Sequence, residues 1–311
     1  MAIEKVSRVN TVLRIALTGP TNAGKTYSAL RLAYGIVKKL FPDLSEEDLW
    51  LKICLIDSEH ERGRAYANRD DLPLPTGSFL YSSIDSPYTP EKYIAAFKEA
   101  ETAVGEKGVV IIDSLSHVWA YTGGVLDIHQ DISKRTKNSY VAWNEASKIQ
   151  NSIIDYIMES SCYVICTMRS KMEYVLETDA STGKSVPSKV GLKPIQRDDL
   201  EYEFDITLQL DKNHIATIIK DITFLNNINF NDIVSEELGK SLIEWMNKGV
   251  SVANINKQKK DNLIIKLKEM GDKNPELITL FKTLFPDKKL NDLTLSEGKH
   301  LLTKFEEVLN G

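Results

Sequence analysis

The stretch Leu13–Tyr34, LRIALTGPTNAGKTYSALRLAY, decides the fold. Its apolar start, Leu13–Leu17, is typical of a buried strand, and apolar residues recur at helical spacing from Leu30 onward. Between them lies the complete pattern G-x-x-x-x-G-K-T, Gly19–Thr26, whose glycines let the backbone approach a phosphate without a Cβ in the way. The N–H groups of such a loop, at the positive end of a helix, attract an anion. The stretch predicts a strand, a phosphate-binding loop and a helix that hold a nucleoside triphosphate.

Two side chains of this loop have expected roles of their own. Lys25 is expected to bridge the β- and γ-phosphates, and the Thr26 hydroxyl is expected to hold Mg²⁺. The residues that we expect to bind the nucleotide from this loop are Gly19, Pro20, Thr21, Asn22, Ala23, Gly24, Lys25, Thr26 and Tyr27.

The composition is that of a soluble globular protein. Of 311 residues, 42% are hydrophobic and 27% are charged, and no apolar run reaches the length of a membrane span or forms the core of a signal peptide. Cys54, Cys162 and Cys166 stand in apolar runs, which favours buried thiols in a reducing cytoplasm over a disulfide framework. The net charge of −5 excludes a globally basic nucleic-acid-binding protein, so any such site must be a local basic patch.

Strands and helices alternate through the first half of the chain. Besides the strand of the phosphate loop, strands are expected at 51–57, 108–114 and 162–167, because these runs are almost wholly apolar, as in parallel strands covered on both faces. The expected helices are 89–104 and 142–160, the second after a polar excursion at 122–140.

The second half of the chain changes in character. Residues 171–202 predict either a long loop or a β-hairpin, and two antiparallel strands are expected at 203–211 and 214–222. We therefore predict an α/β fold for residues 1–250, with a mainly parallel central sheet and a terminal antiparallel hairpin. Three short helical patterns predict a small α-helical module at 251–311.

Carboxylates follow two of the expected strands. Asp113 ends the strand VVIID, where a second metal-orienting carboxylate belongs in phosphate-loop proteins. Asp57, Glu59 and His60 come just after the strand that ends at Asp57, at the sheet edge where α/β proteins bind ligands. A carboxylate at that edge can polarise the water that attacks a γ-phosphate. The alternative is that SEHERGR forms a solvated charged turn.

The motifs GPTNAGKT, IDSEHERGRAYA and VVIIDS, in this order and spacing, resemble the ATPase core of RecA-type recombinases. The runs DSLSHVW, TMRSKMEY, GLKPIQRDDLEYEFD and IIKD resemble more closely the phage-encoded RecA-like ATPases. Those proteins are described as AAA-family ATP-binding proteins and are related to the Sak group of phage recombination and annealing proteins. The resemblance covers residues 11–225, leaves the helical tail outside, and implies a RecA-like P-loop NTPase fold with ATP and Mg²⁺ as cofactors.

The resemblance also implies roles for single residues. Glu59 matches the glutamate that activates water, Asp113 matches the carboxylate on the metal side, and Tyr66 matches the tyrosine that packs on adenine. As the alternative, Tyr66 is a helix residue that packs on the core.

Further roles concern the γ-phosphate. Because the glutamine expected after the fourth strand is absent, the resemblance assigns the γ-phosphate sensor to Thr167 or Arg169. Lys220 resembles the basic residue that reaches into the ATP site of a neighbouring subunit, which implies a homo-oligomer, either a ring or a filament. As the alternative, Lys220 is an ordinary surface lysine.

In RecA-like proteins the loops after the third and fourth strands line a DNA path. Here these segments combine basic residues with the aromatic rings of Tyr140 and Trp143, the ingredients of sequence-tolerant single-strand binding. As alternatives, the basic runs are solvated loops and Trp143 anchors its helix in the core. The expected DNA contacts are Lys134, Arg135, Lys137, Lys171, Lys184, Lys189 and Arg197.

Together with these features, the resemblance implies a DNA-stimulated ATPase that acts on single-stranded DNA in phage recombination or annealing, in the cytoplasm of a bacterial host and without a membrane. One alternative is a helicase or helicase-loader motor, which the lack of a recognisable primase or helicase accessory domain disfavours. Another is a nucleotide-gated adaptor whose C-terminal helices bind a phage or host recombination protein.

Overall fold

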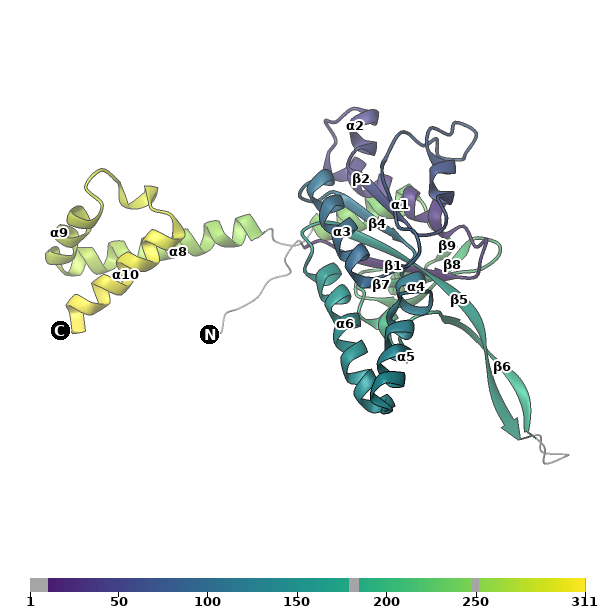
Figure 1. The fold of residues 1–311 in the computed structure, drawn as a ribbon. Coiled ribbons are helices and arrows are strands. Elements are labelled where there is room, and N and C mark those ends of the chain that lie inside the picture. Colours follow the sequence, from purple (N-terminus) through teal and green to yellow (C-terminus); the bar gives the residue numbers. More distant parts are fainter. Residues whose placement is uncertain (1–10, 179–184, 248–251, 311) are drawn as a thin grey trace. The chain divides into compact units, whose positions relative to one another are not determined.

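The computed structural model describes residues 11–178, 185–247 and 252–310. These form two compact units, one comprising Thr11–Trp245 and the other the chain from Met246 onward. The first unit has a central sheet with helices on both faces, whereas the second is helical (Figure 1).

The central sheet is mainly parallel, as predicted. Its strand order is β3-β2-β4-β5-β1-β7-β8-β9, and β6 pairs with β5 beside this path. All neighbours from β3 to β7 are parallel, whereas β8, β9 and β6 run antiparallel to their partners. The strands are β1 Arg14–Gly19, β2 Ile53–Asp57, β3 Leu80–Ser83, β4 Val109–Asp113, β5 Tyr163–Thr178, β6 Ser185–Pro194, β7 Ile206–Leu210, β8 Ile215–Asp221 and β9 Asn231–Ile233.

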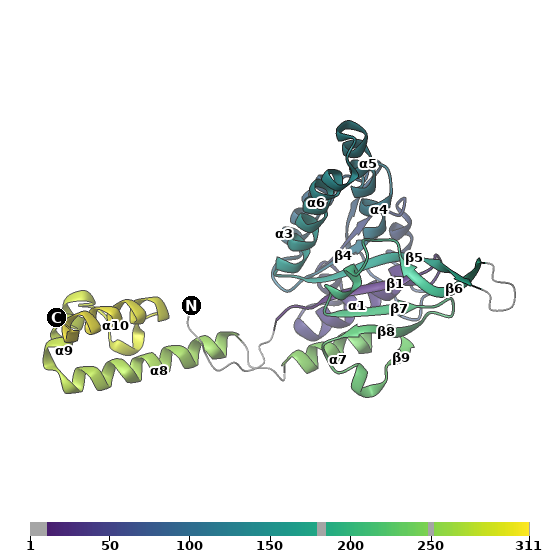
Figure 2. The same ribbon diagram turned by 90° about the horizontal axis from the view of Figure 1, so that it is seen from below.

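Helices cover both faces of this sheet, with α3 and α6 on one face and α1 and α7 on the other (Figure 2). The parallel strands inside the sheet are therefore largely buried: every residue of β2 and β4 is buried, whereas the edge strand β3 is only partly buried. A Cβ on Gly239 would lie 2.4 Å from the Leu32 carbonyl oxygen, so α7 and α1 pack at backbone contact. The helices of this unit are α1 Lys25–Leu40, α2 Glu46–Trp50, α3 Pro90–Val104, α4 Leu115–Ala120, α5 Val125–Thr136, α6 Ser139–Glu159 and α7 Glu236–Asn247.

The prediction of a polar excursion between helices at 122–140 is wrong, because most of this segment forms the helix α5. Val125 and Ile132, seven residues apart, are buried on one side of this helix, which packs against α6. Polar and charged residues occupy most of the other positions of α5, so the apolar stripe is hard to recognise in the sequence. The following helix also begins earlier than expected, since the Asn138 side chain accepts hydrogen bonds from the first N–H groups of α6.

Of the two interpretations of residues 171–202, the hairpin is the observed one. β5 continues past Thr167 to Thr178 and pairs with β6, with a register shift at Glu173/Tyr174. This hairpin extends away from the rest of the sheet (Figure 1).

The C-terminal unit has a hydrophobic core of its own. It contains α8 Val252–Lys273, α9 Pro275–Leu284 and α10 Leu295–Asn310. Leu267, Leu277, Leu293, Leu301 and Phe305 are buried between these helices. Among the described residues, no helix combines the length and the apolar character needed to cross a bilayer. In the first unit, the three cysteine thiols are free and buried, as predicted.

Candidate functional site

The loop between β1 and α1 has a conformation that only its glycines allow at two positions. Gly24 has φ 79°, in the left-handed region, and α1 begins at the next residue, Lys25. A Cβ on Gly19 would lie 2.6 Å from the Leu210 carbonyl oxygen of the neighbouring strand β7. The N–H groups that open α1 therefore face the concave side of the loop, as anion binding requires.

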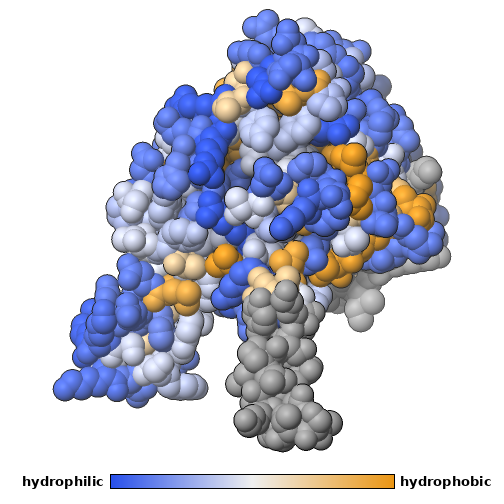
Figure 3. Space-filling view, turned by 90° about the vertical axis from the view of Figure 1, so that its right-hand side faces the viewer, coloured by the Kyte–Doolittle hydropathy of each residue, from blue (hydrophilic) through white to orange (hydrophobic). Residues whose placement is uncertain are grey.

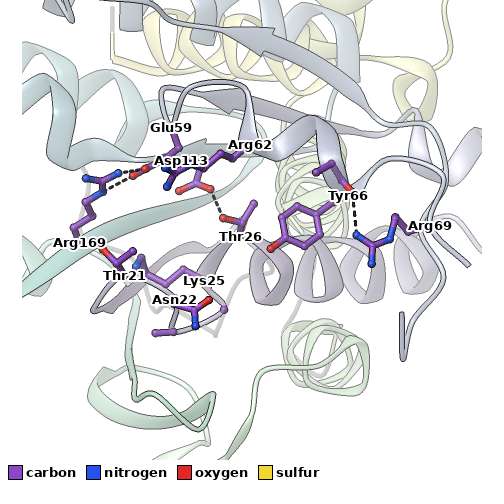
Figure 4. Close-up of a pocket in the computed structure, with 13 residues that line it drawn as sticks. Thr21, Asn22, Lys25, Thr26, Glu59, Arg62, Tyr66, Arg69, Asp113 and Arg169 are labelled. Atoms are coloured by element: carbon purple, nitrogen blue, oxygen red, sulfur yellow. Dashed lines mark hydrogen bonds and ion pairs between the residues drawn. The ribbon is translucent and has the colours of Figure 1, made fainter. Parts of the chain in front are cut away.

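Beside this loop lies a cavity of about 330 Å³ (Figure 4). Residues from four separate parts of the chain converge on it: the phosphate loop, the segment after β2, the end of β4 and the middle of β5. Its lining residues are Thr21, Asn22, Ala23, Gly24, Lys25, Thr26, Glu59, Arg62, Ala65, Tyr66, Arg69, Asp113 and Arg169.

Lys25 is held against its own loop. Its Nζ donates hydrogen bonds to the carbonyl oxygens of Gly19 and Pro20, both at 2.9 Å. Burial lowers the pKa of Lys25, whereas the nearby carboxylates of Asp113 and Glu59 raise it. The ammonium group thus stands in the cavity with only neutral acceptors bound to it, and phosphate oxygens would be stronger partners.

Asp113 connects the phosphate loop to two strands. Its Oδ2 accepts a hydrogen bond from the Thr26 hydroxyl and its Oδ1 accepts one from the Thr167 hydroxyl. Thr167 can reach it because β5 lies between β1 and β4 in the sheet. Burial raises the pKa of Asp113, and the hydrogen bonds from the two hydroxyls act in the opposite direction.

The pair Thr26 and Asp113 suits a hard cation. Hydroxyl and carboxylate oxygens are ligands of Mg²⁺, which also keeps waters and phosphate oxygens in its shell. In the described part of the chain, no group of three or more His, Cys, Asp or Glu side chains is placed to hold a metal ion. The residues present therefore fit a Mg²⁺ that arrives with a phosphate ligand, and not a metal held by protein alone.

The backbone around Glu59 is fixed by the buried Asp57. Asp57 Oδ1 accepts from the Glu59 N–H at 2.5 Å, and its Oδ2 accepts from the Gly63 N–H at 2.8 Å and the Tyr81 hydroxyl at 2.9 Å. His60 and Glu61 between them have φ values of 58° and 59°, in the left-handed region. The carboxylate of Asp57 thus shapes the turn that carries Glu59 to the cavity.

The Glu59 carboxylate forms a two-pronged ion pair with Arg169 (Figure 4). Arg169 Nε donates to Oε1 at 2.6 Å, Nη2 donates to Oε2, and the Ser114 hydroxyl donates to Oε1 at 3.2 Å. Burial raises the pKa of Glu59, but the guanidinium and its hydrogen bonds outweigh burial, and the net shift is downward. Glu59 is therefore ionised at neutral pH.

His117 lies behind this ion pair. Its Nε2 is 3.9 Å from Glu59 Oε1, its Nδ1 is 2.7 Å from the Ser58 hydroxyl, and its ring stacks on Tyr88. Burial lowers the pKa of His117 to about 4, despite the opposing charge of Glu59. His117 is thus a neutral imidazole at pH 7.

The far end of the cavity is aromatic. Tyr66 ends a short 3₁₀ helix, Arg62–Tyr66, and its ring stacks with that of Tyr27 from α1 at a centroid distance of 5.9 Å. The Tyr27 hydroxyl donates to the Leu74 carbonyl oxygen and accepts from the Leu74 N–H. The Tyr66 ring therefore lines the cavity with support from behind, an arrangement that suits a flat heterocycle.

The structure brings most of the expected nucleotide residues to one place. Thr21 to Thr26, Glu59, Tyr66, Asp113 and Arg169 line the cavity. Thr167 is buried and acts on Asp113, and Tyr27 acts on Tyr66. Lys220 lies on β8, and its Nζ bonds to the Tyr202 carbonyl oxygen of the same chain, so its expected role toward a neighbouring subunit stays a prediction.

Several residues at this site were not singled out by the sequence analysis. Arg62, Ala65 and Arg69 line the cavity, and His117 stands behind Glu59. Arg62 and Arg69 flank Tyr66 in the run ERGRAYANR, so their proximity could have been inferred from that tyrosine. For His117 the sequence contains no comparable signal.

The residues expected to contact DNA lie on two separate extensions. Lys134 and Arg135 are in the last turn of α5 and Lys137 is its C-cap. Lys171 and Lys189 are on β5 and β6 of the hairpin, whereas Lys184 lies outside the described residues. Arg197 follows the hairpin and donates to the Asn151 side chain at 2.6 Å.

The aromatic residues near the α5 cluster differ in exposure. Tyr140 is 76% exposed. Trp143 is 38% exposed, with its ring stacked on His129 at 3.9 Å and on Trp119 at 6.2 Å. Trp143 therefore packs α6 against its neighbours while part of its ring stays at the surface, and its expected contact with DNA stays a prediction.

A protein-family model described as "AAA domain" matches residues 11–232, which is more than half of the chain. No curated protein matches the sequence. The matched range contains every residue that lines the cavity.

Proposed function

Because the chain belongs to the AAA domain family, whose members are P-loop ATPases, we propose that it hydrolyses ATP at this cavity and couples hydrolysis to single-stranded DNA. The observation that carries the proposal is the convergence of Lys25, Asp113 and Glu59 on one cavity from three separate elements. A binding pocket alone needs only the phosphate loop, whereas hydrolysis also needs a proton acceptor for water.

Each residue has a part in this reaction. The loop N–H groups and Lys25 hold the phosphates, and Tyr66 packs on the base. Thr26 and Asp113 would hold Mg²⁺, which supplies charge neutralisation on the phosphate oxygens when it is bound. Glu59, ionised and held by its turn, accepts a proton from the attacking water.

Single-stranded DNA is the polymer that we propose as the ligand of the two extensions. The tip of α5 combines Lys134, Arg135 and Lys137 with the exposed ring of Tyr140, which joins phosphate contacts to base stacking. The β5–β6 hairpin starts at the nucleotide cavity, since Arg169 on β5 lines it. The process we propose is phage recombination or annealing.

We further propose that the protein works as a homo-oligomer. Ile219, Ile222, Ile228 and Ile233, on β8, β9 and their connection, are each 40% or more exposed. Apolar groups are visible on the face of the molecule that includes this side of the sheet (Figure 3). Such a surface favours contact with another protein, and Lys220 lies within the same segment.

A second candidate function is that of a nucleotide-gated adaptor. The C-terminal unit has its own core, yet Ile265, Ile278 and Val308 are more than 40% exposed. Apolar side chains on the outside of a small helical unit favour a protein partner, such as a recombination protein.

The deciding experiment is the ATPase rate of the full chain with and without single-stranded DNA, at several salt concentrations. The proposal expects stimulation by DNA that weakens as salt rises, because phosphate contacts release counterions. The variant Lys25→Ala, which we expect not to bind nucleotide, serves as the negative control for the ATPase rate. Turnover that is indifferent to DNA contradicts the DNA part, and tight ATP binding with no turnover favours the adaptor.

A further inference from the structure

The base of the β5–β6 hairpin is bonded to two helices through one buried side chain. The hairpin leaves the sheet at Ser170 and Pro194, the paired residues nearest its base. Two positions after Pro194, the Gln196 carbonyl oxygen accepts a hydrogen bond from the Gln150 amide of α6 at 3.1 Å. Gln196 Nε2 donates to the Leu115 carbonyl oxygen of α4 at 3.0 Å. Gln196 therefore connects the hairpin with both α4 and α6.

The same two helices carry α5, whose tip is the other extension proposed to bind DNA. Trp119 of α4, Val125 of α5 and Ala146 of α6 are buried in one hydrophobic cluster. The orientation of α5 therefore follows α4 and α6. Both the α5–α6 pair and the β5–β6 hairpin project beyond the central sheet (Figure 1). The hydrogen bond from Gln150 to Gln196 thus joins the two extensions close to their bases.

Gln150 occupies a position where an apolar side chain would be more stable. It is 1% exposed, and its Oε1 has no hydrogen-bond partner among the described residues. A buried polar atom without a partner costs stability, and leucine, which has a similar size, would avoid that cost. Every other buried residue of α6 is apolar: Ala142, Ala146, Ile153, Ile154 and Ile157. What the amide supplies, and leucine would not, is a directional bond to the base of the hairpin.

A second hydrogen bond between the same segments lies at the surface. Arg197 Nη1 donates to Asn151 Oδ1 at 2.6 Å. Because water competes for both groups of an exposed bond, this contact constrains the geometry less than the buried amide pair does. The Ile195 N–H donates to the Arg169 carbonyl oxygen, which holds the hairpin base in the sheet without contacting α6. The buried pair is therefore the main polar constraint between α6 and the hairpin.

We propose that the pair Gln150–Gln196 couples the two extensions, so that the tip of α5 and the β5–β6 hairpin bind one DNA strand as a single unit. This inference rests on the proposed binding of single-stranded DNA and names the residues that make it bivalent. A strand bound at one extension meets the other at an effective concentration that depends on how rigidly the two are held. With the bond in place, the second contact is made without the entropy cost of ordering the extensions relative to each other.

The coupling predicts an effect that depends on the length of the DNA. An oligonucleotide that reaches only one extension gains nothing from a bond between them, whereas one that spans both gains the effective concentration. We expect Gln150→Leu to weaken the binding of a spanning oligonucleotide about tenfold and that of a short one by less than about twofold. The slope of log affinity against log salt should stay that of wild type, because every phosphate contact is kept.

The test is fluorescence anisotropy of the full-length protein with labelled oligothymidylates of about 6 to about 40 nucleotides, with and without the β,γ-imido analogue of ATP. The variants are Gln150→Leu and the double variant Gln150→Leu/Gln196→Leu, which replaces both partners by apolar groups and should be close to neutral for stability. The control Ile154→Leu changes a buried residue of the same helix while conserving its volume. Thermal melts show which variants are folded.

A second background separates this coupling from assembly of several protein copies on long DNA. In a protein with Lys134, Arg135 and Lys137 changed to Ala, only the hairpin is left to bind the strand. Adding Gln150→Leu to that protein should change the affinity at no length, because there is no second extension to couple. A further loss for long DNA in this background would assign the effect of Gln150 to assembly and would overturn the proposal.

The remaining results are as clear. A loss confined to long oligonucleotides, and absent without the basic tip of α5, supports the coupling. The wild-type length dependence in both folded variants overturns it. A loss by the same factor at every length overturns it as well, because the glutamines would then act on one extension or on the whole fold. Wild-type protein that binds no oligonucleotide at any length overturns the DNA part of the proposed function itself.

Discussion

Gly19 and Arg169 are direct neighbours in the sheet, paired across β1 and β5. The first glycine of the phosphate loop and the arginine that holds Glu59 therefore share one rigid piece of backbone. Because Glu59 follows β2, two strands away from β5 in the sheet, the ion pair joins two separate parts of the cavity lining. One cation thus lines the cavity beside the phosphate loop and binds the carboxylate from the turn after β2.

Replacing Glu59 by Gln should stop turnover without loss of nucleotide binding. The amide keeps the shape of the side chain but cannot accept the proton of water, so kcat should fall by about 10²–10⁴-fold. Steady-state ATPase assays beside ADP titrations measure the two effects. Glu61→Gln serves as the control and should retain wild-type kcat. Normal hydrolysis by Glu59→Gln would assign the proton acceptor to another group.

Replacing Asp57 by Ala should destabilise the turn that carries Glu59. Three donors, the N–H groups of Glu59 and Gly63 and the Tyr81 hydroxyl, would lose their acceptor, at a cost of about 2–4 kcal/mol in the free energy of unfolding. Urea unfolding measures this value. Tyr81→Phe removes only one of these bonds and should cost about 1 kcal/mol. Equal losses in both variants would mean that Asp57 does not organise the turn.

His117 should make stability depend on pH in a defined window. The pKa of this imidazole is about 4 in the folded protein, against about 6.5 when it is exposed, so the unfolded chain binds a proton first as the pH falls. The free energy of unfolding should therefore decrease from pH 6.5 to pH 4, by up to about 3 kcal/mol. Stability from the lowered pKa of Glu59 is lost only at lower pH, below the value of a free glutamate.

The variant His117→Gln isolates this contribution, because its amide can still bond to the Ser58 hydroxyl but does not titrate. Its unfolding free energy should vary less between pH 6.5 and pH 5 than that of the wild type. His300→Gln, at an exposed position of α10, should keep the wild-type pH profile. A wild-type profile in His117→Gln would show that this histidine does not control acid stability.

Removing the basic residues at the tip of α5 should weaken the binding of single-stranded DNA, because the electrostatic contribution to the affinity becomes smaller. With Lys134, Arg135 and Lys137 all changed to Ala, the slope of log affinity against log salt should become shallower by about 2, since each phosphate contact contributes about 0.7. Fluorescence anisotropy of a labelled oligonucleotide measures it. Changing Lys92, Lys98 and Lys107 removes the same charge elsewhere and should leave the slope unchanged. Equal effects of both sets would indicate attraction by net charge alone.

The sequence predicts those parts of the fold whose pattern lies within a few consecutive residues. The strand, loop and helix of Leu13–Tyr34 follow from apolar spacing and two glycines, and β2 and β4 follow from continuous apolar runs. Asp113 follows in turn, because it ends such a run. The sequence analysis did not predict α5, because only two of its residues, Val125 and Ile132, are buried and most of the segment is polar.

The pair Glu59–Arg169 shows what the sequence could not supply. The two residues are 110 positions apart, and they meet only because β4 and β5 follow β2 in the strand order. Nothing local to TMRSKMEY indicates that its arginine faces the turn after β2. The same holds for His117, whose lowered pKa depends on burial by residues from several elements.

Because β5 is long, the hairpin connects a distant point of the molecule to the cavity through one continuous strand. From Arg169 to Thr178 the strand spans roughly 30 Å without a break in the chain of paired residues, apart from the register shift at Glu173/Tyr174. Tension applied at the outer end would thus travel along covalent and hydrogen-bonded backbone to the guanidinium beside the phosphate loop. The outer part of the hairpin is therefore joined by continuous paired backbone to the arginine that pairs with Glu59.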